Sequence, residues 1–196
     1  MIRVALVDDH PAVRVGLHAV LRGEPGLIPV PVPTSEHPGP DDVLAAQADV
    51  ALVDGQLAVG TGVGLCLKLS RFTAAPPVVL YSAYLDEELA IAARLAGAAG
   101  ALNKSVPLEG LLDTLRTVAG GGTCFPPVST GALRRCADRL QADDLPFLSM
   151  LAHGTSREET ADTLGVEGDA LFARLARMVS TLEHSLMPAV RAASVA

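Results

Sequence analysis

The chain has 196 residues, a formal net charge of −7, 49% apolar residues and only 3% aromatic residues. That length suits one large domain or two modest ones, with a core of small branched side chains. The acidic balance excludes a broadly basic nucleic-acid-binding surface but leaves room for a local basic face. No apolar run reaches the roughly 20 residues of a membrane span, and the first residues lack the pattern of a signal peptide. We therefore expect a cytoplasmic protein with no membrane segment.

Apolar runs and helical patterns alternate through the first 120 residues. Strands are predicted at residues 3–7, 27–32, 50–54, 77–82 and 99–104. Between and after them the apolar spacing predicts helices from Pro11, over 41–47, 63–71 and 87–96, and from Pro107 onward. Pro29, Pro31 and Pro33 make the second strand an edge strand. This alternation predicts a parallel sheet covered by helices on both faces.

The run Val50-Ala51-Leu52-Val53-Asp54 places one carboxylate at the end of a buried strand. Open α/β sheets bind ligands at the carboxyl ends of their strands. An acid at this position is also common as a turn or cap residue, so the strand alone does not define a site.

Other strand ends bring polar side chains to the same edge. The first strand is followed by Asp8 and Asp9, the fourth ends on Ser82, and the fifth ends on Lys104. Carboxylates in such a group repel one another unless a cation lies among them, and hard oxygen ligands favour Mg²⁺. A metal-neutralised Asp54 can attack a phosphoryl group, and a lysine and a hydroxyl are suitable donors to the product.

These residues, in this order and strand context, resemble the receiver domain of a two-component response regulator. The resemblance implies a flavodoxin-like, doubly wound, five-stranded parallel sheet over residues 1–120. It implies phosphorylation of Asp54 by a histidine kinase or a small phosphodonor. It also implies an Mg²⁺ site at Asp9, Asp54 and the backbone carbonyl of Gln56, with Asp8 acting mainly through water. Ser82 and Lys104 would then hold the phosphoryl oxygens.

Two positions depart from the family pattern. Ala101 stands three residues before Lys104, where the family carries the aromatic ring that turns inward on activation. Tyr84, two residues after Ser82, is either a substitute for that ring or an aromatic residue packed on the loop. Ala58 replaces the proline that usually follows the phosphoacceptor by four residues.

Two further features of the first 120 residues are expected to have structural roles. His10 is expected to be a helix-cap or loop residue and not a metal ligand. The glycine-rich run at residues 60–64 is expected to be a flexible loop, because its context does not match a dinucleotide fingerprint.

The three cysteines are widely spaced and include no CxxC pair, so they are expected to be reduced and structural.

The C-terminal third is predicted to be helical. Residues 121–142 are predicted as a linker with a possible helix at 130–140, residues 143–184 as a small all-α domain, and 185–196 as a tail. Ser156 and Glu159 form a capping box before a helix over 157–164, Gly165 makes a turn, and a longer helix covers about 167–182. Short helix, tight turn and longer helix form a helix-turn-helix pattern. The run Gly154 to Val166 resembles the DNA-binding domain of the NarL/LuxR type.

The expected recognition helix is unusually acidic at its start, with Glu167 and Asp169. Acids there suit the helix dipole but oppose contact with phosphates. Arg157, Arg174 and Arg177 are the candidate DNA contacts, and ordinary solvated arginines are the alternative.

The whole sequence therefore predicts a transcriptional regulator that is phosphorylated on Asp54, binds promoter DNA and forms a homodimer when active. Its chemistry would be limited to self-phosphorylation and hydrolysis at Asp54. The alternative is an atypical regulator, controlled by a ligand or a protein, with weak or no phospho-switching or DNA binding. Ala101 and the acidic recognition helix motivate that alternative.

Overall fold

The computed structural model describes residues 1–32 and 38–193, with side chains described as far as residue 184. The chain divides into two compact units. The first, here called the sheet unit, consists of Met1–Leu85 and Ala98–Phe125. The second, the helical unit, consists of Asp86–Gly97 and the residues from Pro126 onward. No helix in the described ranges combines the length and hydropathy needed to cross a membrane.

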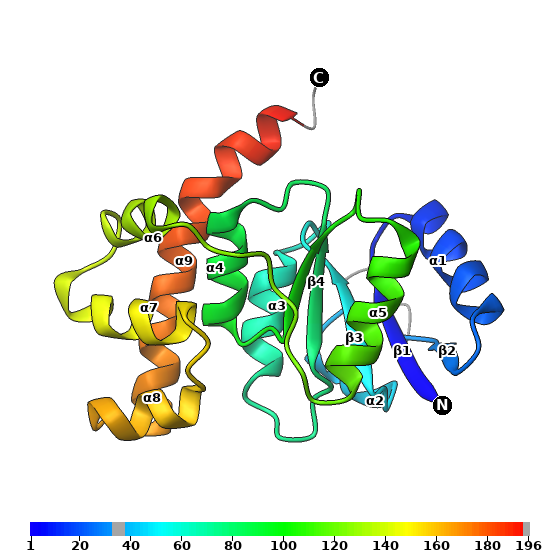
Figure 1. The fold of residues 1–196 in the computed structure, drawn as a ribbon, viewed down its shortest axis with the longest axis horizontal. Coiled ribbons are helices and arrows are strands. Elements are labelled where there is room, and N and C mark those ends of the chain that lie inside the picture. The colour runs from blue at the N-terminus through cyan, green and yellow to red at the C-terminus, as the bar shows by residue number, and fades with distance from the viewer. Residues whose placement is uncertain (33–37, 194–196) are drawn as a thin grey trace. The chain divides into compact units, whose positions relative to one another are not determined.

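A five-stranded parallel sheet forms the centre of the sheet unit (Figure 1). Its spatial order is β2-β1-β3-β4-β5, the flavodoxin-like order predicted from the sequence. The strands are β1 (Ile2–Val7), β2 (Leu27–Val30), β3 (Val50–Asp54), β4 (Val78–Ser82) and β5 (Gly100–Asn103). The second strand lies at an edge, as its prolines indicate, and ends at Val30 instead of continuing to residue 32. Pro31 and Pro33 carry no backbone N–H to extend the ladder.

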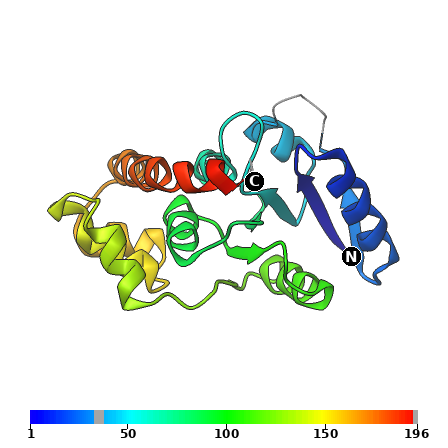
Figure 2. The ribbon, with the colours of Figure 1, turned by 90° about the horizontal axis from the view of Figure 1, so that it is seen from above.

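Helices cover both faces of this sheet. The helix α5 (Leu108–Ala119) lies on one side of the strands, and α2 (Pro40–Ala45) and α3 (Gly62–Leu69) lie on the other (Figure 2). The helix α1 (Pro11–Gly23) packs against β1 and β2. Alternate strand residues contribute to a core shared with α1 and α5, which includes Val4, Leu6, Leu52, Val79, Leu21, Leu111 and Leu115. The central strands β3 and β4 are buried at every residue. These continuous apolar runs, with the helical spacing on α5, are the pattern from which the sheet unit was predicted.

The helical unit contains an element from the middle of the chain. Its helices are α4 (Glu87–Ala96), α6 (Thr130–Ala137), η1 (Ala142–Asp144), α7 (Leu145–Ala152), α8 (Arg157–Leu164) and α9 (Gly168–Ala193). The helix α4 packs against α6, α7 and α9. Ile91 and Leu95 of α4 and Leu175 and Met178 of α9 are fully or almost fully buried.

The ends of α4 and α8 follow the expected capping chemistry. Asp86 Oδ1 accepts a 2.7 Å hydrogen bond from Leu89 N–H at the start of α4. At the start of α8, Ser156 and Glu159 form the predicted reciprocal capping box. Gly97 and Gly165 end these helices in the left-handed conformation, with φ of 89° and 63°.

Two helical segments differ from their predicted extents. The range predicted as a linker contains α6, which ends at Ala137 and not at the predicted residue 140, and α6 packs on α4 and α7. The last helix continues to Ala193, beyond its predicted end near Leu182, so part of the predicted tail is helical. Residues 33–37, between the second strand and the helix predicted from residue 41, lie outside the described residues, as do residues 194–196 of the predicted tail. The predicted domain boundaries stay a prediction.

The three cysteines are free thiols, as expected. Cys66 and Cys136 are buried, and Cys124 is partly exposed. Burial raises the pKa of Cys136 to about 11, so its thiolate is scarce at neutral pH.

Candidate functional site

Two neighbouring strands bring the acids together. In the parallel pair β1–β3, Val7 lies opposite Val53, so the residues that follow each strand emerge side by side. Asp8 follows the end of β1, and Asp54 is the last residue of β3. Both carboxylates are buried, with residue exposures of 5% and 4%. Asp9 is less buried and completes the acidic cluster, which we define as Asp8, Asp9 and Asp54.

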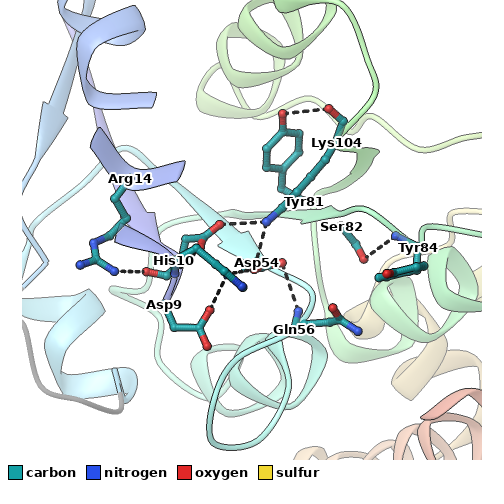
Figure 3. A network of polar contacts seen from close by, with 10 residues as sticks. Asp9, His10, Arg14, Asp54, Gln56, Tyr81, Ser82, Tyr84 and Lys104 are labelled. Atoms are coloured by element: carbon teal, nitrogen blue, oxygen red, sulfur yellow. Dashed lines mark hydrogen bonds and ion pairs between the residues drawn. The ribbon is translucent and has the colours of Figure 1, made fainter. Parts of the chain in front are cut away.

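Lys104 reaches the acidic cluster from the end of β5 (Figure 3). Its Nζ lies 2.9 Å from Asp8 Oδ2 and 3.0 Å from Asp54 Oδ2. Burial opposes the charged form of Lys104, but hydrogen bonds and ion pairs with Asp8 and Asp54 outweigh burial and raise its pKa. The lysine therefore carries its positive charge across the physiological range.

The same surroundings act differently on Asp54. Burial is the largest effect and raises the pKa of this carboxyl, and the negative charge of Asp8 adds to the rise. The hydrogen bonds from Lys104 and from the backbone of Gln56 lower it without cancelling the rise. One ammonium group is thus insufficient to compensate two buried carboxylates, which leaves the pocket short of positive charge.

His10 lies at the open side of the acidic cluster. Its Nδ1 is 2.9 Å from Asp9 Oδ1, 3.2 Å from Asp8 Oδ1 and 3.7 Å from Asp54 Oδ2. Asp8, Asp9, His10 and Asp54 each offer a ligand atom, and these atoms all lie within 4.8 Å of one another. Together they form a group with the dimensions of a cation site.

The loop after β3 is held close to the acids by backbone contacts. Gln56 N–H donates a 3.2 Å hydrogen bond to Asp54 Oδ1. Gly55 lies so near Ser82 that a Cβ at this position would come within 2.7 Å of Ser82 Cβ. A Cβ on Gly62 would come within 2.0 Å of the Asp54 carbonyl oxygen. Two glycines therefore allow the loop to pack tightly under the phosphoacceptor candidate.

Ser82 is buried at the end of β4, at 1% exposure. Its Oγ accepts a 3.2 Å hydrogen bond from the backbone N–H of Tyr84 (Figure 3). The hydroxyl therefore holds the connection between β4 and α4 in this structure. That bond joins Ser82 to Tyr84, the residue that the sequence offers as one possible substitute for the missing switch ring.

Ala101 occupies the position where the family carries the switch aromatic, so no ring is present at that position. Ala101 is buried in β5, at 1% exposure. An aromatic ring nonetheless lies beside the pocket, because Tyr81 of β4 places its ring centroid 5.7 Å from Lys104 Nζ. Its hydroxyl donates a 3.5 Å hydrogen bond to the Lys104 carbonyl. Burial raises the pKa of Tyr81, so this hydroxyl keeps its proton.

The candidate DNA contacts in the helical unit all bind protein groups. Arg174 Nη1 and Arg177 Nη2 lie 3.0 Å and 2.8 Å from the same oxygen, Oδ1 of Asp144. Asp144 is buried, at 1% exposure. Arg157 Nη2 donates a 2.6 Å hydrogen bond to the carbonyl oxygen of Leu95, near the C-terminal end of α4. Arg174 and Arg177 share one acid, whereas Arg157 binds a carbonyl oxygen of another helix, so these contacts do not join the three arginines into one cluster.

The sequence pattern predicted no role in the site for three residues that lie near the acidic cluster. His10 contacts the acids, Tyr81 contacts Lys104, and Arg14 Nη1 donates a 2.7 Å hydrogen bond to the Asp8 carbonyl. Adjacency to Asp9 was a signal for His10, and adjacency to Ser82 was a signal for Tyr81. Arg14 carried no signal, because one helical turn separates it from the acids in sequence.

Comparison with known proteins agrees with this geometry. Residues 4–116 match the response regulator receiver domain family. The DNA-binding transcriptional activator DevR/DosR of Mycobacterium tuberculosis is 28% identical over 192 residues, which span 93% of this chain and 88% of that protein.

Two solved structures resemble nearly all or most of the chain. The response regulator ChrA of a heme-sensing two-component system superposes with a TM-score of 0.52 at 24% identity, over 94% of this chain and 97% of that one. A LuxR family DNA-binding response regulator from Silicibacter pomeroyi gives a TM-score of 0.51 at 28% identity, over 65% of this chain and 98% of that one. At 24% identity, the first likeness supports the fold alone.

Proposed function

Because the chain belongs to the response regulator receiver domain family, we propose that it is a two-component response regulator phosphorylated on Asp54 that regulates transcription by binding DNA. The observation that carries the proposal is the ion pair of Asp54 with Lys104, 3.0 Å apart, within a cluster of buried carboxylates. A nucleophilic carboxylate and an ammonium group at the carboxyl edge of a parallel sheet are the groups that phosphoryl transfer to a protein acid needs.

The residues present fit a divalent cation. Asp9 Oδ1 is buried and accepts no hydrogen bond from the described residues, although the His10 ring lies 2.9 Å away. Asp9, Asp54 and the Gln56 carbonyl would hold Mg²⁺ directly, and Asp8 would act through water. When bound, the ion would neutralise the acids and stabilise the charge on the transferred group.

In the transfer itself, a carboxylate oxygen of Asp54 forms a bond to phosphorus as the bond from phosphorus to the donor breaks. The electron pair of the broken bond stays with the donor, a phosphohistidine of a kinase or a small acyl phosphate. Lys104 then pairs with the phosphoryl oxygens and offsets the net added charge, which is about −1 because the carboxylate loses its own charge in the acyl bond. Ser82 would release the Tyr84 N–H and donate its own O–H to the phosphoryl group.

That exchange of partners at Ser82 is a route for the signal. Residues 83–85, which include Tyr84, connect Ser82 to Asp86, which caps α4. A change in the hydrogen bond between Ser82 and Tyr84 would alter the backbone that enters α4, and α4 packs on the C-terminal helices. Ala101 has no ring to move, so we assign the switch to this connection.

The proposed DNA contacts would have to exchange partners as well. Arg157 would leave the Leu95 carbonyl, and Arg174 and Arg177 would leave or share Asp144. An active homodimer would place two recognition helices on adjacent half-sites of promoter DNA. Such a regulator would act in the cytoplasm, and its only chemistry would be phosphorylation and hydrolysis at Asp54.

Those same contacts favour a second candidate function. If the arginines stay on their protein partners, the helical unit acts by binding a protein or ligand and not DNA. The acidic start of α9, with Asp169, supports this alternative because it would repel phosphates.

Intact mass spectrometry tests the phosphorylation. After incubation with acetyl phosphate and Mg²⁺, the wild-type mass should rise by one phosphoryl group, and Asp54→Asn should show no rise. Asp49→Asn is a matched control, because Asp49 precedes the same strand at its other end and should leave the rise intact. A wild-type protein that never gains the mass would refute phosphorylation at this site.

Gel-shift titrations on the promoter region of its own gene separate the two candidate functions. DNA binding should weaken as salt rises, and Arg157→Gln should reduce it in either phosphorylation state. Absence of any shift at low salt, with and without phosphorylation, would favour the alternative function.

A further inference from the structure

The His10 ring is oriented toward the acidic cluster by the backbone around it. The backbone N–H of His10 donates a 2.8 Å hydrogen bond to Asp8 Oδ1, which ties residue 10 to the first acid. His10 is the N-cap residue of α1, but its side chain makes no capping hydrogen bond to that helix. The expected role as a helix cap is therefore not what positions the imidazole. Its ring nitrogen faces the carboxylates instead (Figure 3).

The Lys104 and His10 side chains lie on different sides of the acidic cluster. Lys104 Nζ contacts Oδ2 of Asp8 and Oδ2 of Asp54. His10 Nδ1 lies nearest Oδ1 of Asp9 and Oδ1 of Asp8. The ring nitrogen is thus beside the oxygens that the lysine leaves available.

The spacing of these atoms suits a shared ion better than a set of hydrogen bonds. One ring nitrogen carries at most one proton, which can serve only one of the three neighbouring carboxylates well. Ligand atoms on opposite sides of a divalent ion lie about 4.2–4.8 Å apart, given bond lengths of about 2.1–2.4 Å. The ligand atoms of this group all lie within 4.8 Å of one another, as a shared ion requires.

Building on the cation site of the proposed function, we propose that His10 Nδ1 is a direct ligand of the bound ion. It makes the site favour first-row transition metal ions over Mg²⁺. An imidazole nitrogen suits ions such as Ni²⁺ and Zn²⁺, whereas Mg²⁺ prefers oxygen ligands only. The side chain has 64% exposure, so Nε2 can keep its proton in contact with solvent while Nδ1 binds the ion. The inference concerns which ion the pocket selects, and Asp54 remains the phosphoacceptor.

Pulsed electron paramagnetic resonance with Mn²⁺ as the probe tests the bond directly. The untagged full-length protein loaded with one equivalent of Mn²⁺ should show ¹⁴N modulation from a coordinated imidazole. His10→Asn should lose this signal while still binding Mn²⁺ through its acids. His18→Asn is the matched control, because His18 lies on the same helix outside the acidic cluster and should keep the signal.

Competition titrations measure the selectivity. Removing the imidazole should weaken Ni²⁺ binding about tenfold or more and change Mg²⁺ binding much less. The ratio of Ni²⁺ to Mg²⁺ affinity should therefore fall in His10→Asn and stay unchanged in His18→Asn.

The outcomes distinguish this inference from the function on which it rests. Wild-type protein that binds Mn²⁺ without ¹⁴N modulation, yet gains a phosphoryl group with Mg²⁺, overturns the role of His10 and leaves the function standing. Modulation that persists in His10→Asn also overturns it. A protein that binds no divalent ion and gains no mass would overturn both.

Discussion

Asp54 shows how a reactive residue can be costly to its own fold. Burial is the main cause that raises its pKa. The hydrogen bond from Lys104, a single lysine that pairs with both Asp54 and Asp8, does not cancel this rise. A folded-state pKa above the unfolded value of 3.8 means that folding disfavours the ionised form. The penalty is absent well below pH 3.8, develops as pH rises through the folded pKa, and is complete above that pKa.

We therefore expect Asp54→Asn to stabilise the metal-free protein at neutral pH, by an amount on the order of 1 kcal/mol. The gain should shrink as the pH is lowered toward the unfolded pKa, because protonated aspartic acid and asparagine are similar there. Urea unfolding at several pH values, with a chelator present, measures it. A variant less stable than wild type at pH 7 would show that the Lys104 ion pair outweighs burial.

Asp144 is the opposite case, a buried acid whose partners make it stabilising. Replacing it with asparagine removes the charge that Arg174 and Arg177 share, and should lower stability by about 2 kcal/mol. Asp143→Asn is the control, since that neighbour is exposed and only its backbone carbonyl binds Arg174. Thermal unfolding that does not distinguish the two variants would refute a structural role for these arginines.

At the scale of elements, α4 is the segment with the most consequential contacts. Glu88 on α4 is buried and pairs with Arg135 of α6 and with Arg139, whose Nη1 lies 2.6 Å from Glu88 Oε2. Burial alone would raise the pKa of Glu88, but hydrogen bonds from the two arginines outweigh it and lower the pKa. Ser129 Oγ adds a 2.5 Å hydrogen bond to Glu87. The segment before α7 thus holds α4 mainly through its first turn.

A lowered pKa makes this attachment sensitive to acid. The contribution of Glu88 is complete above its unfolded pKa of 4.5 and is lost as pH falls through the folded value. Glu88→Gln should therefore lower stability by about 1 kcal/mol at pH 7 and by less at pH 3. Glu158→Gln, at an exposed position on α8, should be neutral at both pH values. Equal effects of Glu88→Gln at the two pH values would contradict the ion pair.

The sequence predicted the acidic cluster because its members lie at or just after the ends of apolar strands, and parallel strands bring such positions to one edge. It could not predict the direction of the His10 ring, which depends on a backbone hydrogen bond to Asp8. Nor could it predict the partner of α4. Residues such as Ile91 and Ala92 indicate a helix buried on several sides, but apolar patterning does not say which elements bury it.

At the scale of the whole molecule, the chain passes between the two units three times. It leaves the sheet unit after Leu85, returns at Ala98 and leaves again after Phe125. The helix α4 is therefore continuous with strands of the sheet unit at both ends while it packs on α6, α7 and α9. Cutting the chain at the predicted linker would separate α4 from those three helices.

A fragment of residues 1–125 should accordingly melt at a lower temperature than the full chain and self-associate, because buried apolar residues of α4 would lose their covering. Size-exclusion chromatography with light scattering, and thermal unfolding at matched concentrations, measure both effects. A monomeric fragment with the melting temperature of the full chain would show that the C-terminal helices are not needed to cover α4.

The three crossings also limit how this protein can be recombined with its relatives. The simplest chimeric regulator would join the N-terminal half of one protein to the C-terminal half of another at a single point in the linker. Here a single junction would pair a borrowed output half with a foreign α4. A functional hybrid should need residues 86–97 transplanted together with the C-terminal helices, so the exchangeable part of this molecule is discontinuous in sequence.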